Sequence, residues 1–419
     1  MYLRALALLP LLVEPAAASV LVVDASGGGA YTTVAAAVSA AHDDDVVLVR
    51  SGTYGAFTVN DKAIDLVADV AASVRIDGRV RIRNLAATRT ATLTGFELRG
   101  LTSGNALLVD GNAGSVRVQG CTILGGEGID CGATSYGGTA VVVQNSVDVA
   151  FARSTLRGGD SGEAILLGDQ AGHGIVATDS RVALHQCTVR GGAGSAFTYL
   201  CGYAYGYVLG GQGGQGLAIV GSATCLVATS QLFGGDGGDS LPPATQHTGC
   251  GGIAFASYAT AGSVVRTLDT SFAAGASGAG APACPPAPPV FTSGVPVVGF
   301  PGSGRRLSAS RVTREHGSVR IDVLGVPGDR VELVFAERGG FAPSDPLRGV
   351  RLLARNAPSL VLQAGTIGAS GRLSVAWTVG ELGPGVESRR LLAQAACIDA
   401  GGVTTMTGAE TIVLLDSAF

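Results

Sequence analysis

The chain has 419 residues and a formal net charge of −4, and only 14% of its residues are charged. This length allows two or three domains, and the low charge excludes the basic surface of a nucleic-acid-binding protein. Glycine is abundant, with 65 residues, whereas aromatic residues make up 5%. Since the glycines show no collagen-like period along the chain, this composition predicts tight turns and closely stacked strands rather than helices.

Residues 1–18 have the pattern of a secretory signal peptide. Arg4 supplies the positive start, residues 6–13 are apolar, and three alanines at 16–18 resemble a cleavage site. The apolar run is too short to cross a bilayer, and no later segment resembles a membrane span. We therefore expect a secreted or cell-surface protein that is not an integral membrane protein.

Residues 33–41 predict a short helix with an Ala/Val face and with Thr32 or Thr33 as its N-cap. Short strands follow it directly. A helix at this place would cap the end of a stack of strands, which otherwise exposes unpaired backbone groups.

A repeat then runs through the chain. Cys121, Ser154, Cys187 and Ser230 begin equivalent segments that are 33, 33 and 43 residues apart. In this register apolar residues recur in columns that alternate with polar positions, as in short strands that bury one face. The main columns are Val116/Val149/Val182/Cys225, Val118/Phe151/Leu184/Val227, Ile123/Leu156/Val189/Leu232, Leu107/Val141/Ile175/Leu217 and Val109/Val143/Ala177/Ile219.

Short alternating strands, glycine corners and a fixed repeat with insertions predict a parallel β-solenoid over residues 19–274. Neighbouring coils would stack about 4.8 Å apart, so that the inward columns form the core. The third repeat carries an insertion with four tyrosines, which we expect to bind substrate: Tyr199, Tyr203, Tyr205 and Tyr207.

The first coil, "DASGGGAYTTVAAAV" followed by "VVLVRSGTY", resembles that of right-handed parallel β-helix proteins of the pectin-lyase-like superfamily. The later "VxVxxxxxxGG" coils are similar to that group as well. The resemblance covers about residues 20–274 and implies a right-handed parallel β-helix. It leaves the activity open, because the superfamily includes lyases, esterases, hydrolases, phage tailspikes and surface proteins without known chemistry.

The eight cysteines fall into two groups. Four lie in glycine-rich loops or in the proline-rich segment, and these are the ones we expect to pair if disulfides form: Cys131, Cys201, Cys250 and Cys284. The other four lie in apolar strands, where a buried free thiol is ordinary packing: Cys121, Cys187, Cys225 and Cys397.

Residues 275–294 are rich in Gly, Ala and Pro and predict a linker without a core pattern. Residues 295–419 return to alternating strands at short spacing, which predicts an antiparallel β-sandwich as an accessory module. Trp377 lies in one of these strands and is expected in its core rather than as a ligand platform.

Acidic residues follow the glycine pairs at the corners of two successive coils. In the repeat register Glu127 stacks on Asp160, and Asp130 stacks on Glu163. Four carboxylates this close cannot all remain ionised and unpaired. A cation such as Ca²⁺ would suit oxygen ligands on glycine loops, so these four residues form our candidate metal site.

Two other interpretations of this corner remain open. Arg157 and Arg190 precede the glycines and stack on each other, so they can neutralise the acids on a solvated structural corner. Alternatively, Asp160 with one of these arginines contacts substrate or acts in catalysis. The third repeat has Ala193 and Ala196 at the acidic positions, which limits the pattern to one pair of coils.

Other motifs give less support to an enzyme. "AGHGIVATD" is similar to an element of polygalacturonase-like hydrolases, but the register places His173 at a polar corner position. Lys62, the single lysine, lies in a scaffold position of the first coil, which disfavours a lyase with a lysine base. His185 alternates outward in its strand, and we expect it to be solvated.

The sequence thus favours a secreted or cell-surface protein that binds carbohydrate or serves a structural or adhesive role through its face loops. The alternative is a polysaccharide lyase or glycoside hydrolase that acts on a uronic-acid-type polymer. Convergent acids and a base in a groove would indicate the enzyme, whereas aromatic residues and polar ladders would indicate the binding protein.

Overall fold

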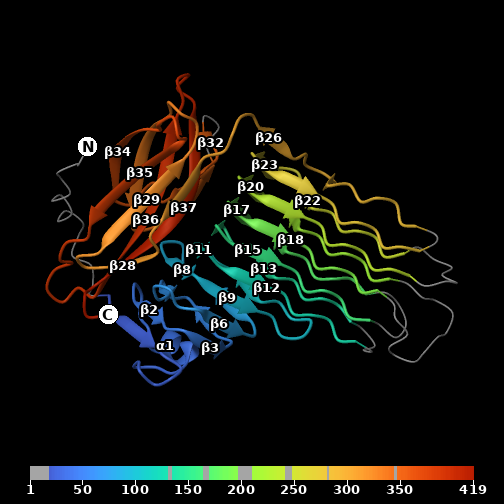
Figure 1. Ribbon diagram of the computed structural model, residues 1–419, viewed down its shortest axis with the longest axis horizontal. Helices are drawn as coiled ribbons and strands as arrows, with labels where there is room; N and C mark the ends of the chain where they lie inside the picture. The colour runs from blue at the N-terminus through green and yellow to red at the C-terminus, as the bar shows by residue number, and fades with distance from the viewer. Residues whose placement is uncertain are drawn as a thin grey trace.

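The computed structural model describes residues 18–130, 135–163, 169–196, 210–240, 248–280, 283–343 and 347–419. Three long parallel sheets and one helix come first along the chain, and antiparallel sheets follow at the C-terminus (Figure 1). The all-β class, the parallel β-helix, the N-terminal helix and the C-terminal antiparallel sheets predicted from the sequence are confirmed.

Each complete coil of the β-helix contributes one strand to each of three parallel sheets, which we call sheets I, II and III. In spatial order, sheet I contains β1 (Val20–Val23), β2 (Val46–Val49), β5 (Asp65–Ala68), β8 (Thr90–Thr94), β11 (Ser115–Gln119), β14 (Asp148–Ala152), β17 (Arg181–His185), β20 (Thr224–Ala228), β23 (Val264–Leu268) and β26 (Val298–Phe300). Of these, β1 and β26 are additional strands, one at each end of sheet I. Sheet II contains β3 (Gly52–Gly55), β6 (Val74–Asp77), β9 (Phe96–Arg99), β12 (Thr122–Leu124), β15 (Thr155–Arg157), β18 (Thr188–Arg190), β21 (Gln231–Phe233) and β24 (Ser271–Ala273). Sheet III contains β4 (Thr58–Asn60), β7 (Val80–Arg83), β10 (Leu107–Asp110), β13 (Val141–Gln144), β16 (Ile175–Thr178), β19 (Leu217–Gly221), β22 (Phe255–Ala259) and β25 (Val290–Thr292).

The strand pairing reproduces the register of the sequence repeat. In sheet I, Val116 pairs with Val149, Val149 with Val182, and Val182 with Cys225. All four side chains are buried in one continuous core that runs through the stack. The columns that the repeat predicts are therefore the interior of the β-helix.

Helix α1 (Val34–Ala40) covers the first coil. Thr33 is its N-cap, and the Thr33 hydroxyl accepts a hydrogen bond of 3.3 Å from the amide of Ala36. At the other end, the ammonium of Lys62 donates to three carbonyl groups of the last turn at 2.7–2.8 Å. Lys62 thus satisfies helix-end acceptors, which agrees with the scaffold position that the sequence indicates.

The parallel sheets extend past residue 274: β25 lies in the range expected to be a linker, and β26 lies in the range expected to be the β-sandwich. β25 pairs with β22, and β26 pairs with β23, so each is the last strand of its sheet. Prolines interrupt the apolar pattern around both strands, at positions 285, 286, 288, 289, 296 and 301. Because proline has no N–H to donate, these residues limit the pairing of a further strand at the end of the stack.

The C-terminal part consists of three further sheets. A three-stranded antiparallel sheet contains β27 (Arg306–Ala309), β29 (Ser318–Leu324) and β35 (Arg372–Thr378). A larger sheet contains β28 (Val312–Arg314), β37 (Thr404–Leu415), β36 (Ser388–Ile398), β30 (Arg330–Ala336) and β34 (Ser359–Thr366), with β32 (Leu347–Arg348) beside β37. β31 (Gly339–Pro343) and β33 (Val350–Leu353) form a pair. A common core lies between the first two sheets, and Trp377 packs edge-on against Phe335 at its side.

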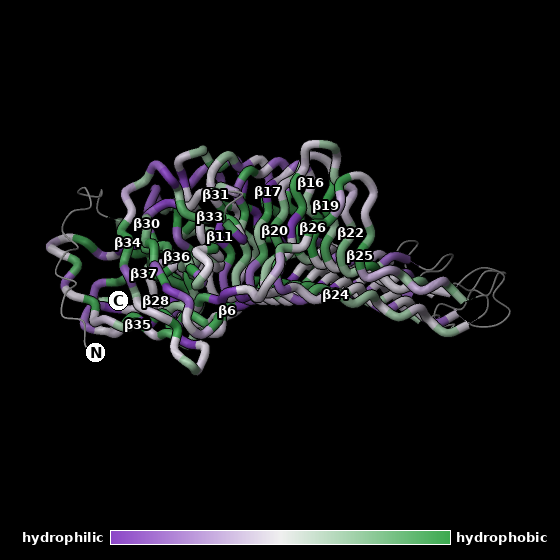
Figure 2. The backbone as a smooth tube through the Cα atoms, turned by 90° about the horizontal axis from the view of Figure 1, so that it is seen from above, coloured by the Kyte–Doolittle hydropathy of each residue, from purple (hydrophilic) through white to green (hydrophobic). Residues whose placement is uncertain are grey.

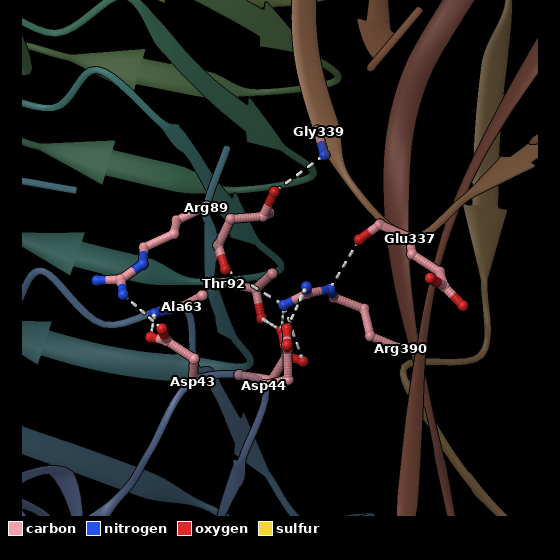
Figure 3. A network of polar contacts seen from close by, with 10 residues as sticks. Asp43, Asp44, Ala63, Arg89, Thr92, Glu337, Gly339 and Arg390 are labelled. Atoms are coloured by element: carbon pink, nitrogen blue, oxygen red, sulfur yellow. Dashed lines mark hydrogen bonds and ion pairs between the residues drawn. The ribbon is translucent and has the colours of Figure 1, made fainter. Parts of the chain in front are cut away.

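The C-terminal sheets cover the outer face of sheet I, and charged side chains connect the two parts. Arg390 on β36 lies between them and is 9% exposed (Figure 3). Its guanidinium contacts the carboxylates of Asp65 and Asp44 at 3.2 Å and donates to the carbonyl of Glu337 at 3.1 Å. Burial raises the pKa of Asp65, while the charge of Arg390 opposes this shift.

A second buried pair lies further along the same face. Arg117 on β11 donates to both carboxylate oxygens of Asp148 on β14, at 2.7 and 2.8 Å. The same guanidinium donates to the carbonyl of Leu352 on β33 at 2.9 Å. A bidentate pair that also bonds across the interface is geometrically demanding, so it fixes how the C-terminal sheets sit on sheet I.

His185 corrects one expectation from the sequence. Its side chain points outward from the β-helix, as the alternation of β17 requires, yet it is 1% exposed because β37 covers it. A Cβ on Gly408 of β37 would lie 2.7 Å from that of His185. Neither ring nitrogen has a hydrogen-bond partner in the described structure, and burial lowers the pKa of His185 to about 4.

We predict that His185 makes the stability of the protein pH-dependent. Its folded pKa lies below its ordinary value of 6.5, so the unfolded state binds the proton first. The stability that comes from burying neutral His185 is therefore fully present above pH 6.5, and it is lost as the pH falls toward 4. The difference in free energy of unfolding between wild type and His185→Leu should change by about 3 kcal/mol over this interval, measured by denaturant titration. His42→Leu, at an exposed histidine, is the control; equal pH profiles for wild type and His185→Leu would contradict the prediction.

Candidate functional site

Between sheets II and III the chain leaves the β-helix in each of the later coils and returns to it. The outgoing segments are 125–130, 158–163, 191–196, 234–240 and 274–280, and the returning segments are 135–140, 169–174, 210–216, 248–254 and 283–289. Together they form a thin layered extension, which we call the fin, that projects from the body (Figures 1 and 2). The acidic corner with Glu127, Asp130, Asp160 and Glu163 lies in this fin.

The fin is held by backbone hydrogen bonds that repeat every third residue. In the second outgoing segment, the amide of Gly158 donates to the carbonyl of Arg190 in the next coil at 3.0 Å. The following amide, that of Gly159, donates to Gly138 in the returning layer at 2.8 Å. A three-residue repeat without bonds inside the segment is typical of the polyproline II conformation, which must take its partners from neighbouring segments.

Glycine is required at the positions that face a neighbouring segment. A Cβ on Gly159 would overlap with the carbonyl oxygen of Gly126, and one on Gly192 would overlap with that of Gly159. Gly235 stands in the same relation to Gly192. The glycine pairs of the repeat therefore do more than turn a corner, because they allow the outgoing segments of successive coils to approach each other directly.

In each outgoing segment that starts with a glycine pair, the residue after the pair faces outward and has room for a side chain. Here the carboxylates accept hydrogen bonds from the backbone of the next coil: Glu127 from the amide of Asp160 at 2.9 Å, and Asp160 from that of Ala193 at 2.6 Å. Asp236 accepts from Ala276 at 2.9 Å in the same way. Each acid thus satisfies an amide for which the stacked segments supply no carbonyl.

The second acidic row has the same geometry further out. Asp130 accepts from the amide of Glu163 at 2.8 Å, and Asp239 accepts from that of Ala279 at 2.6 Å. Glu163 itself is buried in the fin. The alanines of the third repeat fit this arrangement, because Ala193 supplies the amide that Asp160 binds.

The two arginines neutralise acids of the first row. Arg157 donates to Asp160 at 2.7 Å, and Arg190 donates to Asp236 in the next coil at 3.1 Å. Both pairs are partly exposed, so each contributes about 0–1 kcal/mol to stability. The geometry favours the structural interpretation of the acidic corner, in which carboxylates are shared between amides and arginines.

A cation site at Glu127, Asp130, Asp160 and Glu163 stays a prediction. Within the described ranges, these four carboxylates do not bring three ligand atoms together. Such a group is formed instead by Glu315, His316 and Glu381 in the C-terminal part, where His316 and Glu381 are exposed.

Further side chains support the returning layer. His173 accepts a hydrogen bond of 2.9 Å from the amide of Gln215 in the next coil through Nδ1, and burial lowers its pKa. A ring nitrogen that accepts from the backbone is unprotonated, so His173 serves the stack as the carboxylates do. This agrees with the corner position that the register assigns to it.

A disulfide joins the last two returning segments, between Cys250 and Cys284. Cys121, Cys187, Cys225 and Cys397 are free and buried, as expected from their strands. The bond secures the outermost segment, which has a neighbour on one side of the stack only. Cys131 and Cys201 lie outside the described residues, as do Tyr199, Tyr203, Tyr205 and Tyr207.

The fin's three-residue period could have been found in the sequence. Glycines recur at this spacing within single loops, as at 125 and 128, 159 and 162, 191 and 194, and 235 and 238. The period is interrupted by strands in every coil, so it is invisible when the whole chain is searched for a collagen-like repeat.

Comparisons with known proteins add little to this geometry. No protein-family model matches the chain, and no curated protein matches its sequence. Among solved structures, the receptor-binding domain of the Siphovirus 9NA tailspike aligns with 90% of this chain and 97% of its own, with 11% identical residues and a TM-score of 0.14. A TM-score this low carries no argument about fold or function. None of the described helices is long and apolar enough to cross a membrane.

We predict that Gly235→Ala disrupts the fin. The added methyl group must displace the carbonyl of Gly192, which should lower the free energy of unfolding by about 1–3 kcal/mol. Hydrogen exchange should accelerate at fin amides while the amides of sheet I stay protected. Gly55→Ala is the control, since a Cβ there meets no atom within 4 Å. Equal exchange in both variants would show that the close approach at Gly235 does not constrain the fin.

Asp160 distinguishes the structural and cation interpretations. Asp160→Ala removes the acceptor for the amide of Ala193 and should cost about 1 kcal/mol, whereas Asp160→Asn keeps an acceptor and should cost less. Neither loss should depend on Ca²⁺. The measurement is the melting temperature of each variant in CaCl₂ and in EDTA. A Ca²⁺-dependent rise in wild type that Asp160→Ala abolishes would restore the cation site.

Proposed function

We propose that this protein is a secreted or surface-displayed binding protein whose β-helix supports the fin as a contact surface for carbohydrate. Its β-helix would belong to the pectin-lyase-like group that its first coil resembles. The C-terminal sheets would be an accessory module that closes the outer face of sheet I.

The observation that carries the proposal is the construction of the fin. Its segments bury little apolar surface, since glycine is their most frequent residue, and ordering glycine is entropically unfavourable. A core does not need these segments, yet they are built with amide-capping carboxylates, arginine pairs and a disulfide. A rigid extension of this kind is suited to present a surface to a partner.

The fin surface also supports the choice of partner. Along the first acidic row, carboxylates, guanidinium groups and backbone groups recur from coil to coil, as at Arg157, Asp160 and Asp236. This row offers hydrogen bonds at regular spacing, and the exposed acids of the second row, Asp130 and Asp239, make the fin surface acidic overall. A hydroxyl-rich polymer matches this surface better than a nucleic acid or a lipid surface does.

The enzyme alternative finds less support in the geometry. A lyase or hydrolase on a uronic-acid-type polymer needs a free base or acid beside a groove. Asp160 and Arg157 are bonded to each other, and Lys62 is bound to the end of α1. The outer face of sheet I is covered by the C-terminal sheets.

One assay separates the two classes. We expect the full chain to be retarded in affinity electrophoresis by at least one of several immobilised polysaccharides, neutral or acidic. The same protein, incubated with polygalacturonate or alginate with and without Ca²⁺, should release neither unsaturated products nor new reducing ends. Retardation by none of the polymers would refute carbohydrate binding, and product release would establish the enzyme instead.

A further inference from the structure

A pocket of about 390 Å³ lies where the last coils meet the start of the C-terminal sheets. Its floor is made by two successive corners between sheets I and II, at residues 229–231 and 269–271. β26 and the first residue of β27 form its sides. Pockets of this size at the junction of two parts of a chain are typical of small-ligand sites.

The floor of the pocket is rigid because its hydroxyl groups are already used. Thr229 accepts from the amide of Gln186 and donates to Ala228, and Ser230 accepts from the amide of Cys187 at 3.0 Å. The hydroxyl of Thr270 donates to carbonyl groups of sheet I. These bonds fix the backbone on which the outward-facing groups stand.

Other polar side chains of the lining have no partner within the described part of the chain. They are Thr267, Gln231, Ser271 and Arg306. Thr267 pairs with Val227 of an inward column and is 9% exposed, so its side chain lies at the end of the core. The other three side chains are exposed on the outside. One carboxylate oxygen of Asp269 accepts a hydrogen bond of 3.0 Å from the amide of Gly304, and the other oxygen remains available to a ligand.

The lining has a definite chemical character. It combines one acid, Asp269, and one base, Arg306, with hydroxyl and amide groups, so its formal charge is zero. Phe300 supplies an aromatic ring, over which the guanidinium of Arg266 lies at 5.0 Å. The carboxylate of Asp269 can accept hydrogen bonds from ligand hydroxyl groups. The guanidinium of Arg306 and the side-chain amide of Gln231 can donate to ligand oxygens.

From these features we infer that the pocket binds one neutral sugar residue of a carbohydrate partner. A neutral polyol matches a lining of zero charge, whereas a sugar acid would bring its carboxylate close to that of Asp269. The site is separate from the fin, and the inference rests on the proposed carbohydrate binding. It adds the ligand class and the residues that recognise it.

The test compares pocket residues with neighbours of the same kind. Binding of the methyl glycosides of glucose, galactose, mannose and N-acetylglucosamine, and of galacturonate and glucuronate, is measured by titration calorimetry on the full chain. Gln231→Ala is matched with Thr188→Ala, since Thr188 pairs with Gln231 in sheet II and lies outside the pocket. Arg306→Ala is matched with Arg330→Ala, at an exposed arginine elsewhere in the C-terminal sheets.

We expect wild type to bind at least one neutral glycoside, and each pocket variant to weaken this binding at least tenfold. Thr188→Ala and Arg330→Ala should bind as wild type does. Glycoside binding that survives both pocket substitutions would overturn the pocket and leave the proposed function intact. Pocket-dependent binding of the acids alone would overturn the neutral class. If wild type bound none of these sugars, the pocket would be refuted, while retardation by polysaccharides would decide the proposed function separately.

Discussion

The structure depends on one constraint, which is that each coil must pass its backbone hydrogen bonds to the coils beside it. In sheets I, II and III the strands do this by parallel pairing, and the side chains alternate between the core and the outside. In the fin no strand forms, and the segments bond to neighbours in two directions instead. Glycine makes the second direction possible, and carboxylates such as Asp160 provide acceptors for the amides that remain.

The C-terminal sheets are attached to sheet I mainly by side chains rather than by backbone hydrogen bonds. Apolar side chains cover part of sheet I, but Arg117, Arg390 and Arg153 enter the same contact and meet acids there. Buried ion pairs add little net stability over apolar packing, yet breaking one leaves a charge without a partner. The ion pairs therefore disfavour other positions of the C-terminal sheets, which cover the outer face of sheet I.

The sequence predicted the β-helix well because its signal is local and repeated. The columns at Val116 and Leu107 recur in every coil, and the helix cap at Thr33 is a short-range pattern. The last coil escaped prediction, since the prolines that end the stack also erase the alternation around Val290. His185 was misjudged for a different reason: alternation gives the face of a strand, but not what covers that face.

At the acidic corner, the repeat register predicts which carboxylates stack on each other but not which groups bind them. The stacking of Glu127 on Asp160 followed from the repeat, and so did the need for a neutralising group. The partner of each carboxylate could not be predicted, because it is a backbone amide in the next coil, and every residue except proline has such an amide. Arg117 and Asp65 are charged residues at outward positions of otherwise apolar strands, and this pattern is visible in the sequence. Such residues indicate that another part of the chain covers the sheet.

The bond directions in the fin have a mechanical consequence. Hydrogen bonds between its segments run across the direction in which those segments leave and re-enter the body. A pull on the outer end along the segments is thus met in shear, so that all the bonds of a segment share the force at once. The disulfide at Cys250 and Cys284 closes the exposed side of this array. The fin can transmit tension from its outer end to the β-helix without opening one bond at a time.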